Sequence, residues 1–403
     1  MGIEGKRVWY WGALIAALAG CNAEPALVAS NCDKPEGCVS REALKIDAVD
    51  ILLVIDDSPS TAYATARLKA ELPRMLNVIT SGDSDDIEFP PAKSVHVAVT
   101  TTDMGAGEGT NLAGCTAWGR DGTFVKPTEF GVTCDVDYPG FLAFEGGPAP
   151  IATVDTVSCV PLVTPEQTSG AQGFGCGFEQ PLEASLKALL PDDSEVTFVH
   201  GAAHGDGANA GFLRDNSLLV VVVVSDEDDC STEDYSIFDP LSDSNRMSGI
   251  NLACHNSQDK LFDVQRYVDN LKSLRPNNDN VIFAVVAGVP SELTDDDGFR
   301  GNYDLSTDAG ARAYYDAVLA DVRMTDRVTG NEPTQFIAPS CVVVSGQDTS
   351  MAAGATPPRR LIEVAKRFGA RSVVGSLCAD DFGTTTGNLV RTIGEQLAAA
   401  SGD

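Results

Sequence analysis

The chain has 403 residues, and its 58 acidic residues outnumber its 28 basic ones, which gives a formal net charge of −30 at pH 7. Such a surface repels the phosphate backbone of nucleic acids, so the composition argues against DNA or RNA as a partner. The length is sufficient for one large domain or two.

The first residues have the three parts of an export signal. Lys6 and Arg7 give a positive start, residues 8–18 form an apolar run, and the sequence Leu-Ala-Gly ends at Cys21. The apolar run is too short to span a bilayer. The segment resembles the signal of bacterial lipoproteins, in which the cysteine receives a lipid and becomes the new N-terminus. An ordinary secretory signal with a chance cysteine is the alternative.

This resemblance implies a signal peptide at residues 1–20 and lipid on Cys21. We therefore expect an exported protein that is anchored to a bacterial membrane, at the outer membrane or the cell surface. Residues 21–46 are small and polar and contain proline, which predicts a short lipidated tether.

Ten cysteines remain when Cys21 is set aside. An even number in an exported chain favours disulfides, although spacing does not determine which cysteines pair. The pairs that we expect are Cys32 with Cys38, Cys230 with Cys254, and Cys341 with Cys378. A zinc cluster is the alternative, but no Cys-x-x-Cys pair occurs.

From residue 47 onward, apolar runs of strand length alternate with amphipathic patterns of helical period. Strands are predicted at 49–55, 95–101, 218–224, 281–289 and 372–377. Helices are predicted at 68–79, 182–190, 261–271, 311–322, 362–368 and 389–397. This alternation predicts an α/β domain over residues 47–400, with a doubly wound, mostly parallel central sheet and helices on both faces.

Two long segments interrupt the alternation. Residues 104–175 are rich in Gly, Pro and Thr, and residues 290–340 contain an Asp-Asp-Asp run. Loops of this length are unusual within a compact domain. We therefore predict two insertions, the first of them held by disulfides.

Oxygen-bearing side chains follow two of the predicted strands. Asp56, Ser58 and Ser60 come directly after strand 49–55, and Asp226 follows strand 218–224. In an open parallel sheet, ligands bind at the carboxyl ends of the strands. Two carboxylates aimed at one crevice repel each other unless protons or a cation lie between them, and these oxygens suit Mg²⁺.

The strings DILLVIDDSPS and VVVVSDEDDCS resemble the von Willebrand factor type A domains of bacterial surface lipoproteins. The resemblance implies a metal-ion-dependent adhesion site, with Mg²⁺ as the expected ion and Mn²⁺ or Ca²⁺ as alternatives. It implies that Ser58 and Ser60 bind the ion directly and that Asp56 and Asp226 act through water. It also implies that an acidic side chain of a protein or surface ligand occupies the remaining position.

The third loop of this family pattern is different here. Residues 175–182 contain no threonine where the family has one. Cys176 takes the place of that threonine but is expected in a disulfide, so Glu179 is the better candidate ligand. A further carboxylate on the ion weakens its attraction for a ligand acid, which favours metal binding over integrin-like adhesion.

Other interpretations remain open. Asp56 and Ser58 are also suitable caps for the helix that follows. Asp103 either approaches the same crevice or lies in a surface loop, and Asp228 and Asp229 are expected in a solvated loop. His200 and His204 have a metal-like spacing, but they lie among glycines and lack the glutamate of a zinc-protease helix.

These observations favour a non-enzymatic, membrane-anchored protein that binds a divalent cation and, through it, a protein or surface ligand. The alternative is a structural envelope protein whose site is degenerate and free of metal. A hydrolase that uses the ion or the histidine pair is a weaker third hypothesis, because no nucleophile motif is present.

Overall fold

A computed structural model describes residues 45–83, 88–126, 140–145, 160, 175–343 and 353–401. These residues belong to one compact unit, which begins at Leu44. Cys21, Cys32 and Cys38 lie outside the described residues, as do the predicted signal peptide and nearly all of the tether. No helix of the described part is long and apolar enough to cross a membrane.

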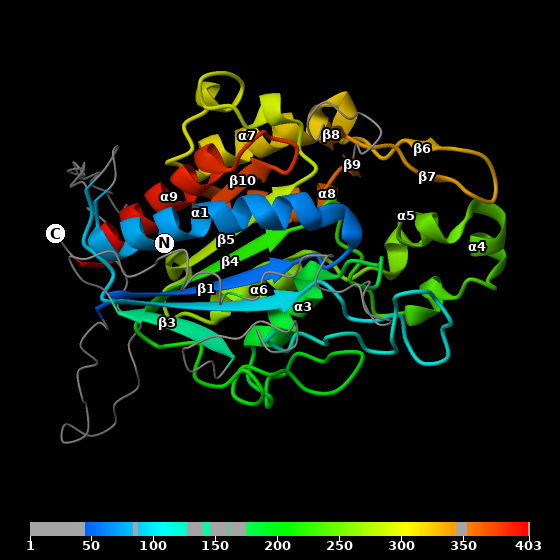
Figure 1. Cartoon of the computed structure of the whole chain (residues 1–403), viewed down its shortest axis with the longest axis horizontal. Helices are drawn as coiled ribbons and strands as arrows, with labels where there is room; N and C mark the ends of the chain where they lie inside the picture. The colour runs from blue at the N-terminus through cyan, green and yellow to red at the C-terminus, as the bar shows by residue number, and fades with distance from the viewer. Residues whose placement is uncertain are drawn as a thin grey trace, which may run out of the picture. The chain divides into compact units, whose positions relative to one another are not determined.

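A six-stranded sheet forms the centre of the unit (Figure 1). Its strands, in spatial order, are β10 (Ser372–Ser376), β5 (Val281–Ala287), β4 (Ser217–Val224), β1 (Ala48–Ile55), β2 (Ser94–Thr101) and β3 (Phe141–Glu145). All neighbouring pairs are parallel except β2 with β3. The prediction of an α/β domain with a mostly parallel central sheet is therefore confirmed.

Helices cover both faces of this sheet. Helices α1 (Ala62–Ser81) and α9 (Gly383–Ser401) pack on one face, and α3 (Pro181–Leu189), α6 (Gln265–Ser273), α7 (Asp308–Ala320) and α8 (Arg359–Phe368) pack on the other. Alternate residues of β1 divide between the two layers: Ile51 and Leu53 face the first, and Leu52 and Val54 face the second. Burial on both faces explains why β1, β4 and β5 are almost purely aliphatic.

Helix α6 begins four residues later than the apolar spacing predicts. The backbone of Leu261 forms a β-bridge with Thr232, and Phe262 N–H donates to the carbonyl of Ser231. Residues 261–262 are therefore bound to the segment that follows β4 and are not helical.

The two predicted insertions contain regular structure. The first contributes the edge strand β3, which was not predicted because the run FLAFE is short and lies among glycines and prolines. Its Leu142 and Phe144 are buried, since alternate side chains of a strand share one face. The second contains α7 and the hairpin of β6 (Val328–Thr329) and β7 (Phe336–Ile337).

Three disulfides join described cysteines. The predicted pairs Cys230–Cys254 and Cys341–Cys378 are confirmed, and Cys115 is bonded to Cys176 across 61 residues of sequence. The remaining short elements are α4 (Asp243–Ser248), α5 (Ala253–Asn256), β8 (Cys341–Val343) and β9 (Ala353–Ala355). Strands β8 and β9 form a separate antiparallel pair.

A buried ionic cluster lies near the amino ends of the central strands. The carboxylate of Asp50 in β1 is completely buried, and its oxygens lie 2.6 Å from Arg214 Nη2 and 3.4 Å from Arg275 Nη2. Arg275 also donates to Ser217 Oγ in β4 at 2.7 Å. This cluster joins the start of β1 to two segments that are distant in sequence.

Removing the buried carboxylate should be costly, because it leaves two arginines without their partner in a low dielectric. We expect Asp50→Ala to lower the free energy of unfolding by about 3–5 kcal/mol, measured by urea denaturation. Lys93→Ala is the control, because Lys93 is 74% exposed and pairs with Asp47 near the same end of the sheet. That exposed pair should contribute less than about 1 kcal/mol, and equal losses in the two variants would contradict the role given to the buried cluster.

Candidate metal centre

The two acidic loops meet because their strands are neighbours. Strands β1 and β4 pair in parallel with Ile55 opposite Val224, and Asp56 N–H donates to the carbonyl of Val224 at 2.9 Å. Asp56 and Asp226 therefore emerge at the same carboxyl edge, as the sequence predicts. The hydroxyl of Ser225 donates to Asp56 Oδ2 at 2.9 Å, which ties the two loops together.

The loop after β1 is organised around the Asp56 side chain. Its Oδ1 accepts the N–H of Ser58 at 2.8 Å, and the hydroxyl oxygens of Ser58 and Ser60 lie 2.9 Å apart. Thr61 immediately precedes α1 and makes no side-chain capping bond. The structure thus brings both serine hydroxyls together, and capping of α1 does not account for the Asp56 carboxylate.

Glu179 is held at this edge by backbone hydrogen bonds on both sides. The N–H of Gln180 donates to the carbonyl of Thr102 at 3.0 Å, and the N–H of Cys230 donates to the carbonyl of Glu179 at 2.8 Å. The Glu179 side chain is only 1% exposed, and its Oε2 accepts the hydroxyl of Thr102. The segment before α3 is therefore fixed between the ends of β2 and β4.

Three carboxylates near this edge have an unsatisfied oxygen. Asp57 Oδ1, Glu179 Oε1 and Asp226 Oδ1 are buried, and none of them has a hydrogen-bond partner among the described residues. Buried polar atoms are usually paired, and an unpaired carboxylate oxygen carries a large desolvation cost. A cation at this edge would satisfy such atoms, so the residues present fit a divalent ion.

The same burial alters the acidity of these groups. Burial, together with the nearby charges of Asp103 and Asp56, raises the pKa of Asp57 to about 8. Burial and Asp56 raise the pKa of Asp226 to about 9, and burial also raises the pKa of Glu179 well above its usual value. Burial first, and repulsion among the carboxylates second, disfavour their charged forms, so protons or a cation at this edge would stabilise it near neutral pH.

Two disulfides flank the candidate ligands. Cys176 lies three residues before Glu179 and is bonded to Cys115, while Cys230 lies four residues after Asp226 and is bonded to Cys254. Both disulfides belong to a small apolar cluster that includes Phe178. The prediction that Cys176 is in a disulfide is confirmed, so its sulfur is not available as a ligand.

Asp228 and Asp229 do not lie in a solvated loop, and that prediction is wrong. Asp228 accepts the backbone N–H of Arg360 at 3.0 Å in the first turn of α8. Asp229 is buried and accepts the N–H of Leu182 at 3.1 Å in the first turn of α3. Two helix N-termini with no side-chain cap of their own thus use these carboxylates, which suit the positive end of a helix.

Other residues of this edge were missed or left open by the sequence. Asp103 is buried beside Asp57, where its Oδ1 accepts the N–H of Gly105, so it does not belong to an exposed loop. Asp57, Thr102 and Ser225 were not predicted. Their position at the ends of buried strands is the signal that would have found them, because such residues share one edge of a parallel sheet.

The two histidines of the His-x-x-x-His sequence have separate partners. The ring of His200 stacks on Trp118 with centroids 4.3 Å apart, and His204 Nε2 lies 3.4 Å from Asp121 Oδ2. The buried Lys187 binds Asp121 and the carbonyl of His200. These contacts give both histidines a structural role in the segment after α3.

Among the described residues, one group of three acids has carboxylates as close together as a shared metal ion requires, and it is not the buried edge. The carboxylates of Asp192, Asp193 and Asp206 lie within 4.8 Å of one another and are exposed. Asp206 Oδ1 also accepts the N–H of Asp192 at 2.7 Å. This exposed triad is an alternative site for a cation, so an experiment on metal binding has to distinguish it from the buried edge.

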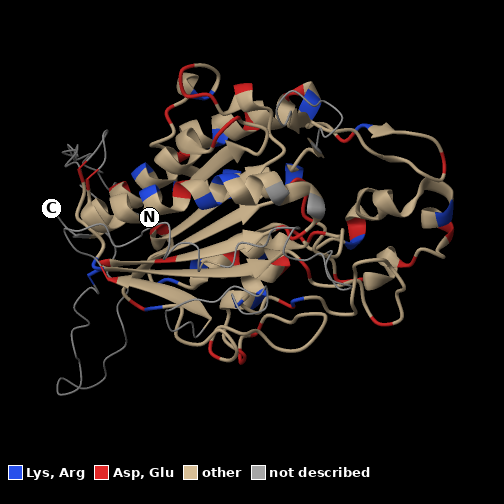
Figure 2. Ribbon diagram, in the orientation of Figure 1, with Lys and Arg blue, Asp and Glu red and all other residues tan. Residues whose placement is uncertain are grey.

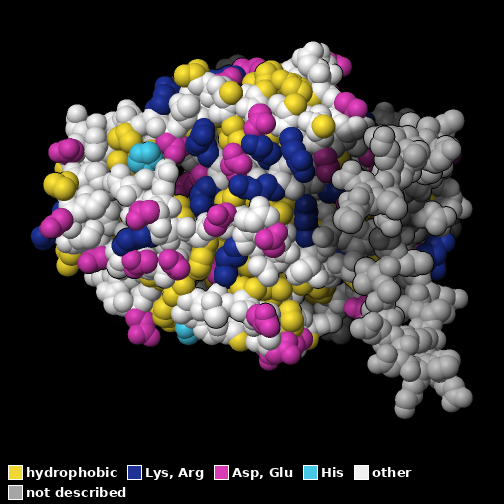
Figure 3. All heavy atoms as spheres, turned by 180° about the vertical axis from the view of Figure 1, so that it is seen from behind, with side chains coloured by type: hydrophobic (Ala, Val, Ile, Leu, Met, Phe, Trp, Pro, Cys, Tyr) yellow, Lys and Arg dark blue, Asp and Glu magenta, His cyan; other side chains and the backbone are white. Residues whose placement is uncertain are grey.

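Charge is unevenly distributed over the surface. Figure 2 shows acidic residues in the loops at the carboxyl edge of the sheet. From behind, basic side chains gather near the centre of the face, with acidic ones between them (Figure 3). Helices α6 and α8 pack together and carry the basic residues Arg266, Lys272, Lys366 and Arg367. Lys272 Nζ donates to the carbonyl of Arg367 at 3.0 Å across this contact.

Compared with known protein families and with characterised proteins, the chain matches no family model and none of the characterised sequences.

The raised pKa values predict a dependence of stability on pH in the absence of metal. An acid whose pKa is higher in the folded state than in the unfolded state retains its proton after the unfolded chain has lost it. Stability therefore falls as the pH rises from about 4 toward the folded pKa. In chelator, we expect the free energy of unfolding to decrease between pH 5 and 8.

Asp226→Asn should reduce that decrease by more than about 1 kcal/mol, because the amide does not titrate. Urea denaturation at several pH values measures the effect. Asp193→Asn is the control at an exposed position and should leave the slope unchanged. An identical slope in the wild type and Asp226→Asn would contradict the assignment.

Proposed function

We propose that this chain is a membrane-anchored lipoprotein whose globular unit is a von Willebrand factor type A domain. In this proposal the domain is not an enzyme. It binds a divalent cation, best Mg²⁺, at the carboxyl edge of β1 and β4, and through the ion it binds a protein or surface ligand. The resemblance of the two acidic loops to that family supports the proposal, as does the order of strands around them.

One observation carries the metal site. The carboxylates of Asp57, Glu179 and Asp226 each keep one buried oxygen without a donor among the described residues, although all three lie close to Asp56. A divalent cation neutralises such a set, and hard oxygen ligands are those that Mg²⁺ prefers.

The ligand roles follow from the resemblance and from the contacts of each side chain. Ser58 and Ser60 would bind the ion directly through hydroxyl groups that already lie 2.9 Å apart. Asp56 and Asp226 would act through bound water. Because Asp56 already accepts hydrogen bonds from Ser58 and Ser225, its orientation is fixed before any ion binds.

Glu179 changes the charge that surrounds the proposed ion. A threonine hydroxyl is neutral, whereas a carboxylate in its place adds a negative charge. More negative charge around the ion strengthens its retention and weakens its attraction for a ligand carboxylate. We therefore propose tight metal binding with a moderate affinity for an acidic ligand.

A passive structural role in the cell envelope is the second candidate. The raised pKa values of Asp57 and Asp226 support it, because protonated carboxyl groups at this edge tolerate each other without metal. The same domain would then serve as a scaffold with a proton-shared site.

Isothermal titration calorimetry with Mg²⁺ and Mn²⁺ separates the two candidates. We expect the intact protein to bind, and we expect Asp56→Ala to lose at least tenfold in affinity, a cost of about 1.4 kcal/mol. The reason is that Asp56 orients Ser58 and joins the two loops. Glu179→Gln should also weaken binding, since it removes a charge from the site.

Asp206→Ala is the matched control, because it disrupts the exposed triad and leaves the buried edge intact. Binding that survives Asp56→Ala and is lost in Asp206→Ala would assign the ion to the exposed triad. The absence of any binding heat in the wild type, with no gain in thermal stability from Mg²⁺, would favour the passive scaffold.

A further inference from the structure

One unpaired polar atom near the candidate metal centre is not explained by a cation. Asp57, Glu179 and Asp226 each have a buried acceptor oxygen that a cation would satisfy. The hydroxyl oxygen of Tyr63 is also buried, and no described residue makes a hydrogen bond with it. A phenol can donate a hydrogen bond, and buried groups of this kind are usually paired. The Tyr63 hydroxyl therefore requires an acceptor.

The start of α1 places Tyr63 at the metal edge. Helix α1 begins at the carboxyl edge of the sheet, where β1 ends, and Tyr63 lies in its first turn (Figure 1). The hydroxyl of Thr61 holds this turn against the loop after β1, since it lies 2.8 Å from the carbonyl oxygen of Asp56 and 2.9 Å from that of Ser58. Burial, and then the nearby charges of Asp226 and Asp56, raise the pKa of Tyr63 above its usual value. The phenol therefore keeps its proton and remains a donor.

A positive charge lies beside this phenol. The guanidinium carbon of Arg67, one turn further along α1, lies 5.4 Å from the centroid of the Tyr63 ring. Arg67 also donates to the carbonyl of Ala379 in the segment after β10. No carboxylate in the described part of the chain forms an ion pair with Arg67. Its charge therefore favours an anion on this side of the metal edge.

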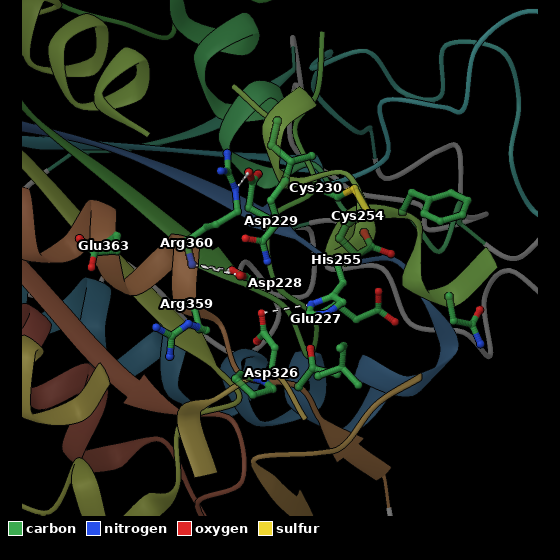
Figure 4. Close-up of a pocket in the computed structure, with 18 of the residues that line it drawn as sticks. Glu227, Asp228, Asp229, Cys230, Cys254, His255, Asp326, Arg359, Arg360 and Glu363 are labelled. Atoms are coloured by element: carbon green, nitrogen blue, oxygen red, sulfur yellow. Dashed lines mark hydrogen bonds and ion pairs between the residues drawn. A yellow bond between two sulfur atoms is a disulfide. The ribbon is translucent and has the colours of Figure 1, made fainter. Parts of the chain in front are cut away.

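A cavity of about 880 Å³ also borders the metal edge, with Glu179 in its wall, but Tyr63 and Arg67 do not line it. The arginines of this wall are bound to other groups of the chain: Arg360 pairs with Asp229 at 3.1 Å, Arg367 with Glu363 at 3.6 Å, and Arg359 donates to the carbonyl of Met324. Figure 4 shows Arg360 between the carboxylates of Asp228 and Asp229. The side of the edge that faces α1 is therefore the one that keeps an unpaired donor.

We propose that the Tyr63 hydroxyl binds the carboxylate of the acidic ligand residue and, with the charge of Arg67, makes this edge select an acid over its neutral amide. One oxygen of the ligand carboxylate would lie on the ion, and the other would accept the hydrogen bond from Tyr63. A hydrogen bond to a charged acceptor is stronger than one between neutral groups, so it offsets the attraction that the charge of Glu179 removes. The inference rests on the proposed function, because it assumes that an ion at this edge receives a ligand acid.

The test uses two probes that differ in charge. N-acetyl-aspartate methylamide carries a carboxylate, and N-acetyl-asparagine methylamide has nearly the same shape but is neutral. The full chain is loaded with a limiting amount of Mn²⁺, whose unpaired electrons broaden the NMR signals of a probe bound beside it. All chains in the test carry Asp206→Ala, so that the exposed triad does not hold the ion. We expect the aspartate probe to bind at least about fivefold more tightly than the asparagine probe.

Tyr63→Phe should lower the affinity for the aspartate probe at least about fivefold, because the variant keeps the ring and loses only the donor. Its affinity for Mn²⁺, measured from the EPR signal of the free ion, should remain within about twofold of the parent value, since the hydroxyl is not a ligand of the ion. Tyr303→Phe is the matched control. Tyr303 is a half-buried tyrosine that packs in the helix layer on the other face of the sheet, so its variant should keep both affinities.

An unchanged affinity for the aspartate probe in Tyr63→Phe would overturn the proposal, and so would equal binding of the two probes to the parent chain. A loss of Mn²⁺ affinity in Tyr63→Phe with no further loss of the acid would also overturn it, because the hydroxyl would then serve the ion itself. If the parent chain binds no Mn²⁺, the proposed function fails and this inference fails with it. If Mn²⁺ binds and the probes do not behave as expected, the inference alone fails.

Discussion

The parallel pairing of β1 with β4 is the constraint on which the candidate centre depends. Because Ile55 stands opposite Val224, the chain leaves the sheet as an acidic loop at two adjacent positions. The two strands are held in this register by aliphatic side chains buried on both faces. The hydrophobic core therefore brings together carboxylates that would separate in water.

The acids at this edge have different hydrogen-bond partners, and these partners offset part of the repulsion among them. Asp228 and Asp229 stabilise the N-termini of α8 and α3, where a negative charge is favourable. Asp56 is held by donors from its own loop and from Ser225. Among the described residues of this edge, the buried carboxyl oxygens without donors belong to Asp57, Glu179 and Asp226, so the uncompensated part of the edge is small and well defined.

The sequence predicts the sheet well because strands buried on both faces leave a continuous apolar signal. It also predicts that Asp56 and Asp226 share an edge, which follows from strand order alone. It fails where tertiary contacts decide the outcome. The strand β3 is too short to stand out, and the roles of Asp228 and Asp229 depend on helices that begin about 50 and 130 residues away in the chain. Thr102 contacts Glu179 only because the segment before α3 binds β2.

The disulfides beside the two acidic loops make the stability of this edge depend on the redox state of its surroundings. In a reducing compartment, Cys115, Cys176, Cys230 and Cys254 remain thiols. The two loops are then held only by backbone hydrogen bonds and by the small apolar cluster around Phe178. Oxidation adds covalent closure of segments 61 and 24 residues long. The covalently closed form of the edge thus belongs to the oxidised chain, and reduction would return to these loops the conformational freedom that the two cross-links remove.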